Sequence, residues 1–253
     1  MHKPFFLENS ESSSVVVFIH GFMGSPQHFE GLAKSIQAQG HSVASLLLPG
    51  HASTAKAFSL STMEMWQDHV NTEVERLTFT YRSIFLVGHS MGCLLAINAA
   101  IKYCEKVTGL YLIACPFVLN GFSMQSLRVR LKQTFYRKNH PMKSAYIAGS
   151  SVPLTPGLIW RSIKPAAELK KLMRVTKENL CNVRAPVTAV YSPADEIVSM
   201  KSLDVLKSGL THATFDYVAL SDSNHAYYPD PEQAIIESSL LAAVPGVLTG
   251  GGK

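Results

Sequence analysis

The sequence predicts an α/β fold with a mostly parallel, doubly wound sheet, and two observations support this prediction. Short aliphatic and β-branched runs alternate along the chain with segments whose apolar residues recur at helical spacing. The chain has 253 residues and is 47% hydrophobic, which suits one large domain with a substantial core. Strands that alternate with helices of this length are typical of a parallel sheet with helices on both faces.

Each predicted element follows from a local pattern. The first strand is the run Ser-Val-Val-Val-Phe-Ile, and the helix after it begins at a proline and closes before Gly40. The third strand is a short aliphatic run ended by Gly88, and the segment that follows is rich in good helix formers. The predicted strands are residues 14–19, 41–48, 83–87, 107–114, 187–191 and 214–220. The predicted helices are residues 26–39, 61–81, 91–100, 200–209 and 231–243.

Composition and the chain ends bear on the location of the protein and on metal binding. The first residues contain only a short apolar cluster, too short for a signal peptide or a membrane span, so we expect a cytoplasmic protein. The cysteines have no C-x-x-C spacing, so we expect free thiols and no metal. These cysteines are Cys93, Cys104, Cys115 and Cys181.

Ser90 lies between two glycines where a predicted strand meets a predicted helix, in the run Gly-His-Ser-Met-Gly. A strand that turns into a helix within a few residues strains the corner residue, and Gly88 and Gly92 leave the room that this turn needs. Such a corner presents the Ser90 hydroxyl beside the first free N–H groups of the helix. We therefore interpret Ser90 as a nucleophile for acyl transfer; an ordinary turn serine is the alternative.

A serine nucleophile needs a base, and the base needs a third group that holds it. Ligands of such sheets bind outside the carboxyl ends of the strands. Two loops at these ends offer the groups: Asp195 follows the fifth predicted strand, and His225 follows the sixth. Because one βα unit separates them, neighbouring strands would bring the two loops side by side. Glu196 and Asp222 remain alternatives for the acid.

Acyl transfer also needs two N–H donors for the oxyanion. The N–H of Met91, directly after the nucleophile, is one candidate. The second is the N–H of Phe22, in the loop after the first strand, where Gly21 lets the backbone turn inward. A tight turn without a catalytic role is the alternative for this loop. We interpret His20 and His51 as structural, hydrogen-bonded histidines.

Five motifs make the chain resemble the α/β-hydrolase superfamily, in particular its carboxylesterase and monoacylglycerol-lipase members. They are HGFMGS (20–25), PGH (49–51), GHSMG (88–92), PADEIV (193–198) and SNH (223–225). The order serine, acid, histidine agrees with that scheme. The resemblance implies the α/β-hydrolase fold, with Ser90 as nucleophile, Asp195 as acid, His225 as base, and Phe22 and Met91 as oxyanion donors. The chain departs from the family at Ala52, where members often have a glycine.

The net charge of +5 is unevenly distributed. Residues 117–184 carry 13 Lys and Arg against 2 acidic residues, a balance of +11, and the remainder carries −6. In the family that the chain resembles, an insertion after the fourth strand caps the active site. We therefore expect residues 1–116 and 185–253 to form the core and residues 117–184 an inserted helical cap. Its basic faces could be solvated, or could attract anionic lipid surfaces or a phosphorylated substrate.

Two amphipathic stretches of this segment could line an acyl pocket or pack on the core. Their apolar residues are Phe122, Leu127, Leu131 and Phe135 in the first, and Leu169, Leu172, Met173 and Leu180 in the second.

The resemblance implies a serine hydrolase that cleaves carboxylic esters, either short- to medium-chain acyl esters or monoacylglycerols. An acyl thioesterase or a carbon–carbon bond hydrolase would use the same three residues. A ligand-binding protein without turnover is the alternative outside the enzymes. We expect a small-molecule acyl ester as substrate, no cofactor and no nucleic-acid partner. The sequence leaves the oligomeric state open.

Overall fold

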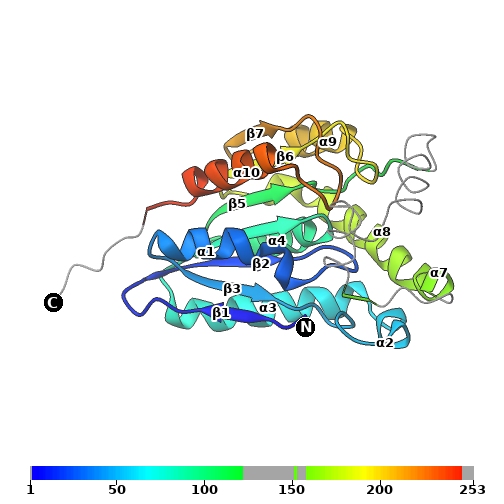
Figure 1. Cartoon of the computed structure of the whole chain (residues 1–253), viewed down its shortest axis with the longest axis horizontal. Helices are drawn as coiled ribbons and strands as arrows, with labels where there is room; N and C mark the ends of the chain where they lie inside the picture. The colour runs from blue at the N-terminus through cyan, green and yellow to red at the C-terminus, as the bar shows by residue number, and fades with distance from the viewer. Residues whose placement is uncertain (1, 122–150, 153–157, 247–253) are drawn as a thin grey trace.

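The computed structural model describes residues 2–121, 151–152 and 158–246, and its centre is a seven-stranded sheet in the order β1-β3-β2-β4-β5-β6-β7 (Figure 1). Neighbouring strands pair in parallel except β1, which pairs antiparallel with β3. The predicted mostly parallel sheet is therefore confirmed. The strands are β1 (Phe5–Leu7), β2 (Ser14–Ile19), β3 (Ser42–Leu46), β4 (Ser83–His89), β5 (Val107–Ile113), β6 (Val187–Tyr191) and β7 (Phe215–Ala219).

Helices cover both faces of the sheet (Figure 1). One face packs against α1 and α10, and the opposite face packs against α3, α4, α8 and α9. The α-helices are α1 (Glu30–Ala38), α2 (Ala55–Ser59), α3 (Met63–Thr80), α4 (Met91–Lys102), α7 (Leu158–Arg161), α8 (Ile163–Glu178), α9 (Lys201–Gly209) and α10 (Asp230–Ala243). Two 3-10 turns, η1 (Pro26–Phe29) and η2 (Leu180–Asn182), complete the described elements.

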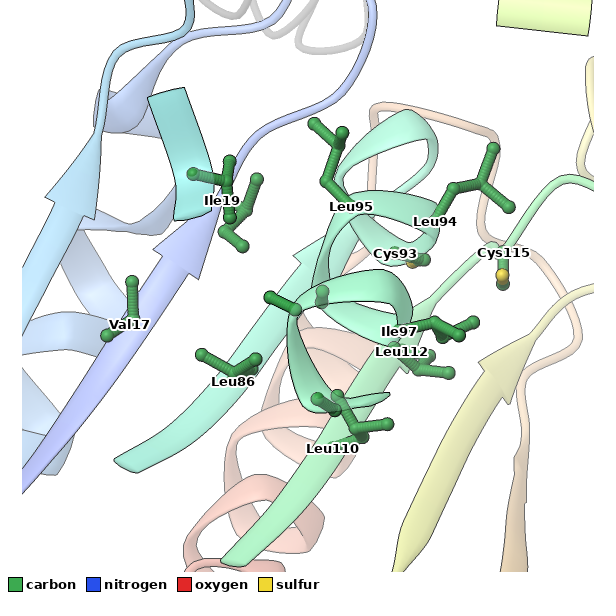
Figure 2. Close-up of a cluster of buried hydrophobic side chains, with 14 of the residues drawn as sticks. Val17, Ile19, Leu86, Cys93, Leu94, Leu95, Ile97, Leu110, Leu112 and Cys115 are labelled. Atoms are coloured by element: carbon green, nitrogen blue, oxygen red, sulfur yellow. The ribbon is translucent and has the colours of Figure 1, made fainter. Parts of the chain in front are cut away.

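The core centres on α4, which is apolar on nearly every side and almost fully buried. Figure 2 shows its side chains packed against those of β2, β4 and β5, which contribute Val17, Leu86 and Leu110 among others. Burial of each large aliphatic side chain stabilises the fold by about 1.5–3 kcal/mol. A well-packed helix directly after Ser90 fixes the start of α4, and so fixes the corner that carries the serine.

Several elements differ from the sequence-based prediction. The edge strand β1 and the short helix α2 were not predicted, because three and five residues respectively are too few to show a period. The helix expected over residues 26–39 divides into η1 and α1, since Ser25 caps a 3-10 turn that begins at Pro26. The strand expected over residues 41–48 ends at Leu46.

The described parts of residues 117–184 pack on the core. In α8, Leu172 is buried in the main core cluster, and Leu169 and Met173 pack against that cluster. Glu168 accepts a hydrogen bond from the N–H of Met63, at the start of α3, and so ties the two helices together. The predicted amphipathic stretch from Phe122 to Phe135 lies outside the described residues. Among the helices described, none is long and apolar enough to span a membrane.

Candidate active site

Ser90 occupies the corner between β4 and α4, and its backbone is strained. Its φ of 52° and ψ of −121° lie outside the regions that residues with a side chain normally adopt. The two flanking glycines are required by crowding: a Cβ at Gly88 would lie 2.5 Å from Cys93 Cα, and a Cβ at Gly92 would lie 1.9 Å from the Ile19 carbonyl oxygen. The corner therefore has the geometry expected of a nucleophile elbow.

The structure brings Ser90, His225 and Asp195 together in one hydrogen-bonded path. Ser90 Oγ lies 3.0 Å from His225 Nε2, and His225 Nδ1 lies 2.8 Å from Asp195 Oδ2. Because the carboxylate can only accept, Nδ1 carries the proton and Nε2 is free to accept from the serine. Asp195 and His225 come from the loops after β6 and β7, which are adjacent strands. The serine is 7% exposed and the aspartate 4%, so the path is largely shielded from water.

Asp195 is held in place by its own loop and by the segment that follows β5. Its Oδ1 accepts hydrogen bonds from the N–H groups of Ile197 and Val198, at 2.7 and 2.8 Å. Its carbonyl oxygen accepts from the Asn120 side chain at 2.9 Å. Leu119 also forms an antiparallel bridge with Val198. These contacts orient the carboxylate and leave Oδ2 for the imidazole.

The charges near His225 favour its protonated form. Burial alone would lower the pKa of His225, but the charge on Asp195, the hydrogen bond to it and the charge on Glu196 act in the opposite direction. The pKa of His225 is consequently raised above its usual value of 6.5. An imidazole with a raised pKa is a stronger base, and its protonated form is stabilised beside Asp195.

The two alternative acids lie elsewhere. Glu196 is buried, and its Oε2 accepts a hydrogen bond from the backbone N–H of His225 at 3.1 Å rather than from the ring. Asp222 is exposed, and its N–H donates to Glu232 Oε1 at 2.9 Å. Asp195 is thus the carboxylate that faces the imidazole.

The loop with Phe22 passes directly over the corner. A Cβ at Gly21 would lie only 2.9 Å from Ser90 Cβ, so only a glycine lets the two segments approach this closely. The Met91 N–H is the first of α4, where no preceding helical turn supplies an acceptor. Met91 therefore follows Ser90 directly with a free N–H, and Phe22 follows the glycine that contacts the corner.

Two buried histidines connect this loop with the loop after β3. His51 Nε2 accepts the N–H of Met23 at 3.1 Å, and His20 Nε2 accepts the N–H of Leu48 at 3.1 Å. Burial lowers the pKa of His51 to about 4 and that of His20 well below its usual value, so both rings are neutral at neutral pH. Both histidines are buried and hydrogen-bonded, as the sequence analysis expected.

Three residues hold the His225 loop, of which the sequence pointed only to Glu196, and to that residue as an alternative acid. His89 Nε2 lies 2.8 Å from the carbonyl oxygen of His225, and Glu196 accepts the N–H of the same residue. Glu232, in the first turn of α10, accepts the N–H groups of Ser221 and Asp222. Only the position of His89 and Glu196 next to Ser90 and Asp195 could have drawn attention to them.

A cavity of about 290 Å³ lies between α1, α10 and the loop after His225. Its lining includes His28, His89 and Tyr228 but not Ser90, so it lies behind the corner rather than above the hydroxyl. Within the part of the chain that the structure describes, no group of His, Cys, Asp or Glu side chains could hold a metal ion. All four cysteines are free.

Comparison with known proteins places the chain in a family. A family model for the alpha/beta hydrolase fold matches residues 14–141. The chain belongs to the alpha/beta hydrolase family. This confirms the resemblance drawn from the five motifs. This alpha/beta hydrolase is also 26% identical over 244 residues to a thermostable monoacylglycerol lipase of Bacillus sp. strain H-257, with 94% of the chain and 92% of the relative covered.

Solved structures share the fold over nearly the whole chain. A metagenome-derived lipolytic enzyme superposes with a TM-score of 0.75 at 23% identity, covering 96% of this chain and 97% of that one. A soluble variant of the Saccharomyces cerevisiae monoglyceride lipase superposes with a TM-score of 0.71 at 14% identity, covering 94% of this chain and 89% of that one. At these identities the likeness shows the fold, and this alpha/beta hydrolase must be assigned an activity from its own site.

Proposed function

We propose that this alpha/beta hydrolase is a serine hydrolase that cleaves carboxylic esters through an acyl-enzyme intermediate. The observation that carries the proposal is the hydrogen-bonded path from Ser90 Oγ through the His225 imidazole to Asp195, with distances of 3.0 and 2.8 Å. A serine at a strained corner, a base in the correct tautomer and a buried carboxylate behind it are the parts that acyl transfer requires.

In the proposed reaction, Ser90 Oγ attacks the ester carbonyl carbon while His225 Nε2 takes the serine proton. The carbonyl oxygen becomes an oxyanion, for which the N–H groups of Phe22 and Met91 are the proposed donors. When the C–O bond breaks, the proton on His225 passes to the leaving alkoxide, which departs as an alcohol. Asp195 keeps the ring oriented and stabilises the imidazolium.

The acyl-enzyme is then hydrolysed by the same groups in the same order. His225 takes a proton from water, the hydroxide attacks the acyl carbon, and the proton returns to Ser90 Oγ as the carboxylic acid leaves. No further reactant is needed, because water supplies both the nucleophile and the proton.

For the substrate, we propose short- to medium-chain acyl esters or monoacylglycerols. The relative that supports this proposal is the monoacylglycerol lipase of Bacillus sp. strain H-257, which matches 94% of the chain. The test is an activity screen with p-nitrophenyl esters of increasing acyl length, monoacylglycerols and acyl thioesters. A preference for thioesters would replace the ester proposal with a thioesterase, and binding without turnover would favour a ligand-binding protein.

The role of Ser90 has a direct test. Ser90→Ala should lower kcat by about 10⁴-fold or more, because only oxyanion and binding contributions would remain. A fluorophosphonate probe should label the wild type and leave the variant unlabelled. Ser45→Ala is a matched control, since it removes another buried serine hydroxyl, in β3, and should leave labelling intact. Near wild-type turnover of Ser90→Ala would reject the mechanism.

We further propose that residues 117–184 form an inserted subdomain whose basic surface associates with anionic lipid. Arg161 and Lys164 are exposed at the junction of α7 and α8. Beside them, Trp160 is 76% exposed and Ile163 is also exposed. Exposed apolar side chains flanked by basic residues are the combination with which proteins bind membrane interfaces.

A further inference from the structure

The loop that carries His225 has no regular secondary structure of its own. It joins β7, which ends at Ala219, to α10, which begins at Asp230. Loops are in general the most mobile parts of a fold, whereas a catalytic base must be held close to its working position. The contacts that restrain this loop are therefore of interest for the proposed reaction.

Both backbone polar groups of His225 are bonded to side chains from elsewhere in the chain. The N–H donates to Glu196 Oε2 at 3.1 Å, and the carbonyl oxygen accepts from His89 Nε2 at 2.8 Å. The Tyr228 hydroxyl contacts the same carbonyl oxygen at a longer 3.3 Å. The backbone of His225 is thus held by the last residue of β4 and by a residue of the loop after β6.

The two partners of the His225 backbone are each adjacent in sequence to a residue that the imidazole contacts. His89 directly precedes Ser90, and Glu196 directly follows Asp195. Each side chain therefore links the backbone of His225 to a residue that its imidazole must reach. If the loop shifted toward or away from Ser90, the bond to His89 would lengthen, and a shift relative to Asp195 would lengthen the bond to Glu196.

Both side chains that bind the His225 backbone are buried. Glu196 is 2% exposed and His89 is 6% exposed, so neither side chain can exchange its partner for bulk water. Burial, with His225 and His28 nearby, lowers the pKa of His89 well below its usual value, so its ring is neutral. Since a carbonyl oxygen can only accept, the single ring proton of His89 is on Nε2. Its ring also lies against that of His225, with 5.0 Å between centroids and 46° between the ring planes, and this contact restrains the same loop.

We propose that His89 and Glu196 are positioning residues that hold the backbone of His225 so that its imidazole reaches Ser90 and Asp195 simultaneously. This inference rests on the proposed function, in which His225 is the base. Neither residue touches the substrate or the reacting atoms in this proposal. Both act through His225, and a displacement of the base by about 1 Å can cost about 10²-fold in rate.

The first test removes the donor at position 89. His89→Phe keeps a ring of similar shape but cannot donate, whereas the side-chain amide of His89→Gln can still reach the His225 carbonyl oxygen. We expect His89→Phe to lower kcat by about 10–100-fold with little change in KM, and His89→Gln to recover most of that loss. His28→Phe is the matched control, because His28 lies in the same cavity with its ring centroid 5.5 Å from that of His89.

Position 196 provides an independent test if His89→Phe fails to fold. Glu196→Gln keeps an oxygen that can accept the His225 N–H but removes the charge, so kcat should be retained while the acid limb of the pH–rate profile moves to lower pH. Glu196→Leu should lower kcat as well. The other titratable groups around the imidazole, Asp195, His89, His28 and Tyr228, are unchanged in both variants.

An NMR measurement tests the positioning role independently of ester hydrolysis. If the wild type hydrolyses no ester, the proposed function fails, and an NMR titration of the His225 imidazole still tests the positioning role. The Nδ1–H signal of an imidazole bound to Asp195 should be present in the wild type, His89→Gln and His28→Phe, and lost in His89→Phe. Wild-type kcat and an unchanged Nδ1–H signal in His89→Phe, or equal damage from His89→Gln and His89→Phe, would overturn the proposal.

Discussion

Replacing Ser90 by glycine should remove activity and give a more stable protein than replacing it by alanine. The φ of 52° and ψ of −121° at Ser90 place a residue with a side chain in a region that costs about 1–3 kcal/mol. Glycine adopts that region without strain but is less favourable than alanine by about 0.5–1 kcal/mol through backbone entropy. Taking the middle of each range leaves a net gain of about 1 kcal/mol for Ser90→Gly over Ser90→Ala.

The comparison with Ser90→Ala isolates this effect, because both variants lose the hydroxyl and its bond to His225 and only alanine keeps the strain. For a domain of this size, about 1 kcal/mol corresponds to a rise in Tm of about 2–4 °C. Differential scanning calorimetry of the wild type and both variants measures it, and urea unfolding at 25 °C checks the free energy directly. If Ser90→Gly is no more stable than Ser90→Ala, the corner stores no strain and the reasoning is wrong.

Three further predictions concern the base, the corner and the basic surface. The base must be neutral to act, so kcat/KM should fall as the pH drops. Because the pKa of His225 is raised, the midpoint of this fall should lie above pH 6.5. A pH profile that is flat down to about pH 5 would contradict a histidine base. Gly88→Ala should prevent folding or lower the free energy of unfolding by several kcal/mol, because the added Cβ would overlap α4. Gly31→Ala is the control: its added Cβ would meet open space, so thermal unfolding should show an unchanged or higher stability. Binding to anionic vesicles should shift the fluorescence of the exposed Trp160. Raising the salt from 0.1 to 1 M should weaken this binding, because the Debye length falls from about 10 to about 3 Å. A response to neutral vesicles alone, or a response that salt does not change, would contradict the lipid proposal.

Much of the fold could be predicted because its central strands are buried on both faces and its helices are amphipathic. A run such as residues 14–19 has few alternatives to a buried strand, since all but its first residue is buried. The edge strand β1 could not be predicted in this way, because its three residues depend on pairing with β3 rather than on a pattern of their own. The helix α2 likewise depends on a cap at Thr54 and on packing of Phe58.

The proximity of Ser90, Asp195 and His225 could be predicted because parallel strands end at a common edge. Their catalytic roles remain predictions that await the experiments above. The partners of the His225 backbone could not be predicted, because every residue has the same N–H and carbonyl group and the sequence does not show which side chain will meet them. The identity of Glu196 as a backbone acceptor rather than the acid is visible only in three dimensions.

The late position of β7 and α10 in the chain has a consequence for synthesis. Domains form from the N-terminus as the ribosome extends the chain, at about 5–20 residues per second. Ser90 and the strands β2, β4 and β5 around it emerge first, whereas His225 and the loop anchor Glu232 are translated more than a hundred residues later. A nascent chain would thus display a serine without its base for several seconds, and reactivity toward a serine-directed probe would report completion of the last βα unit rather than of the core.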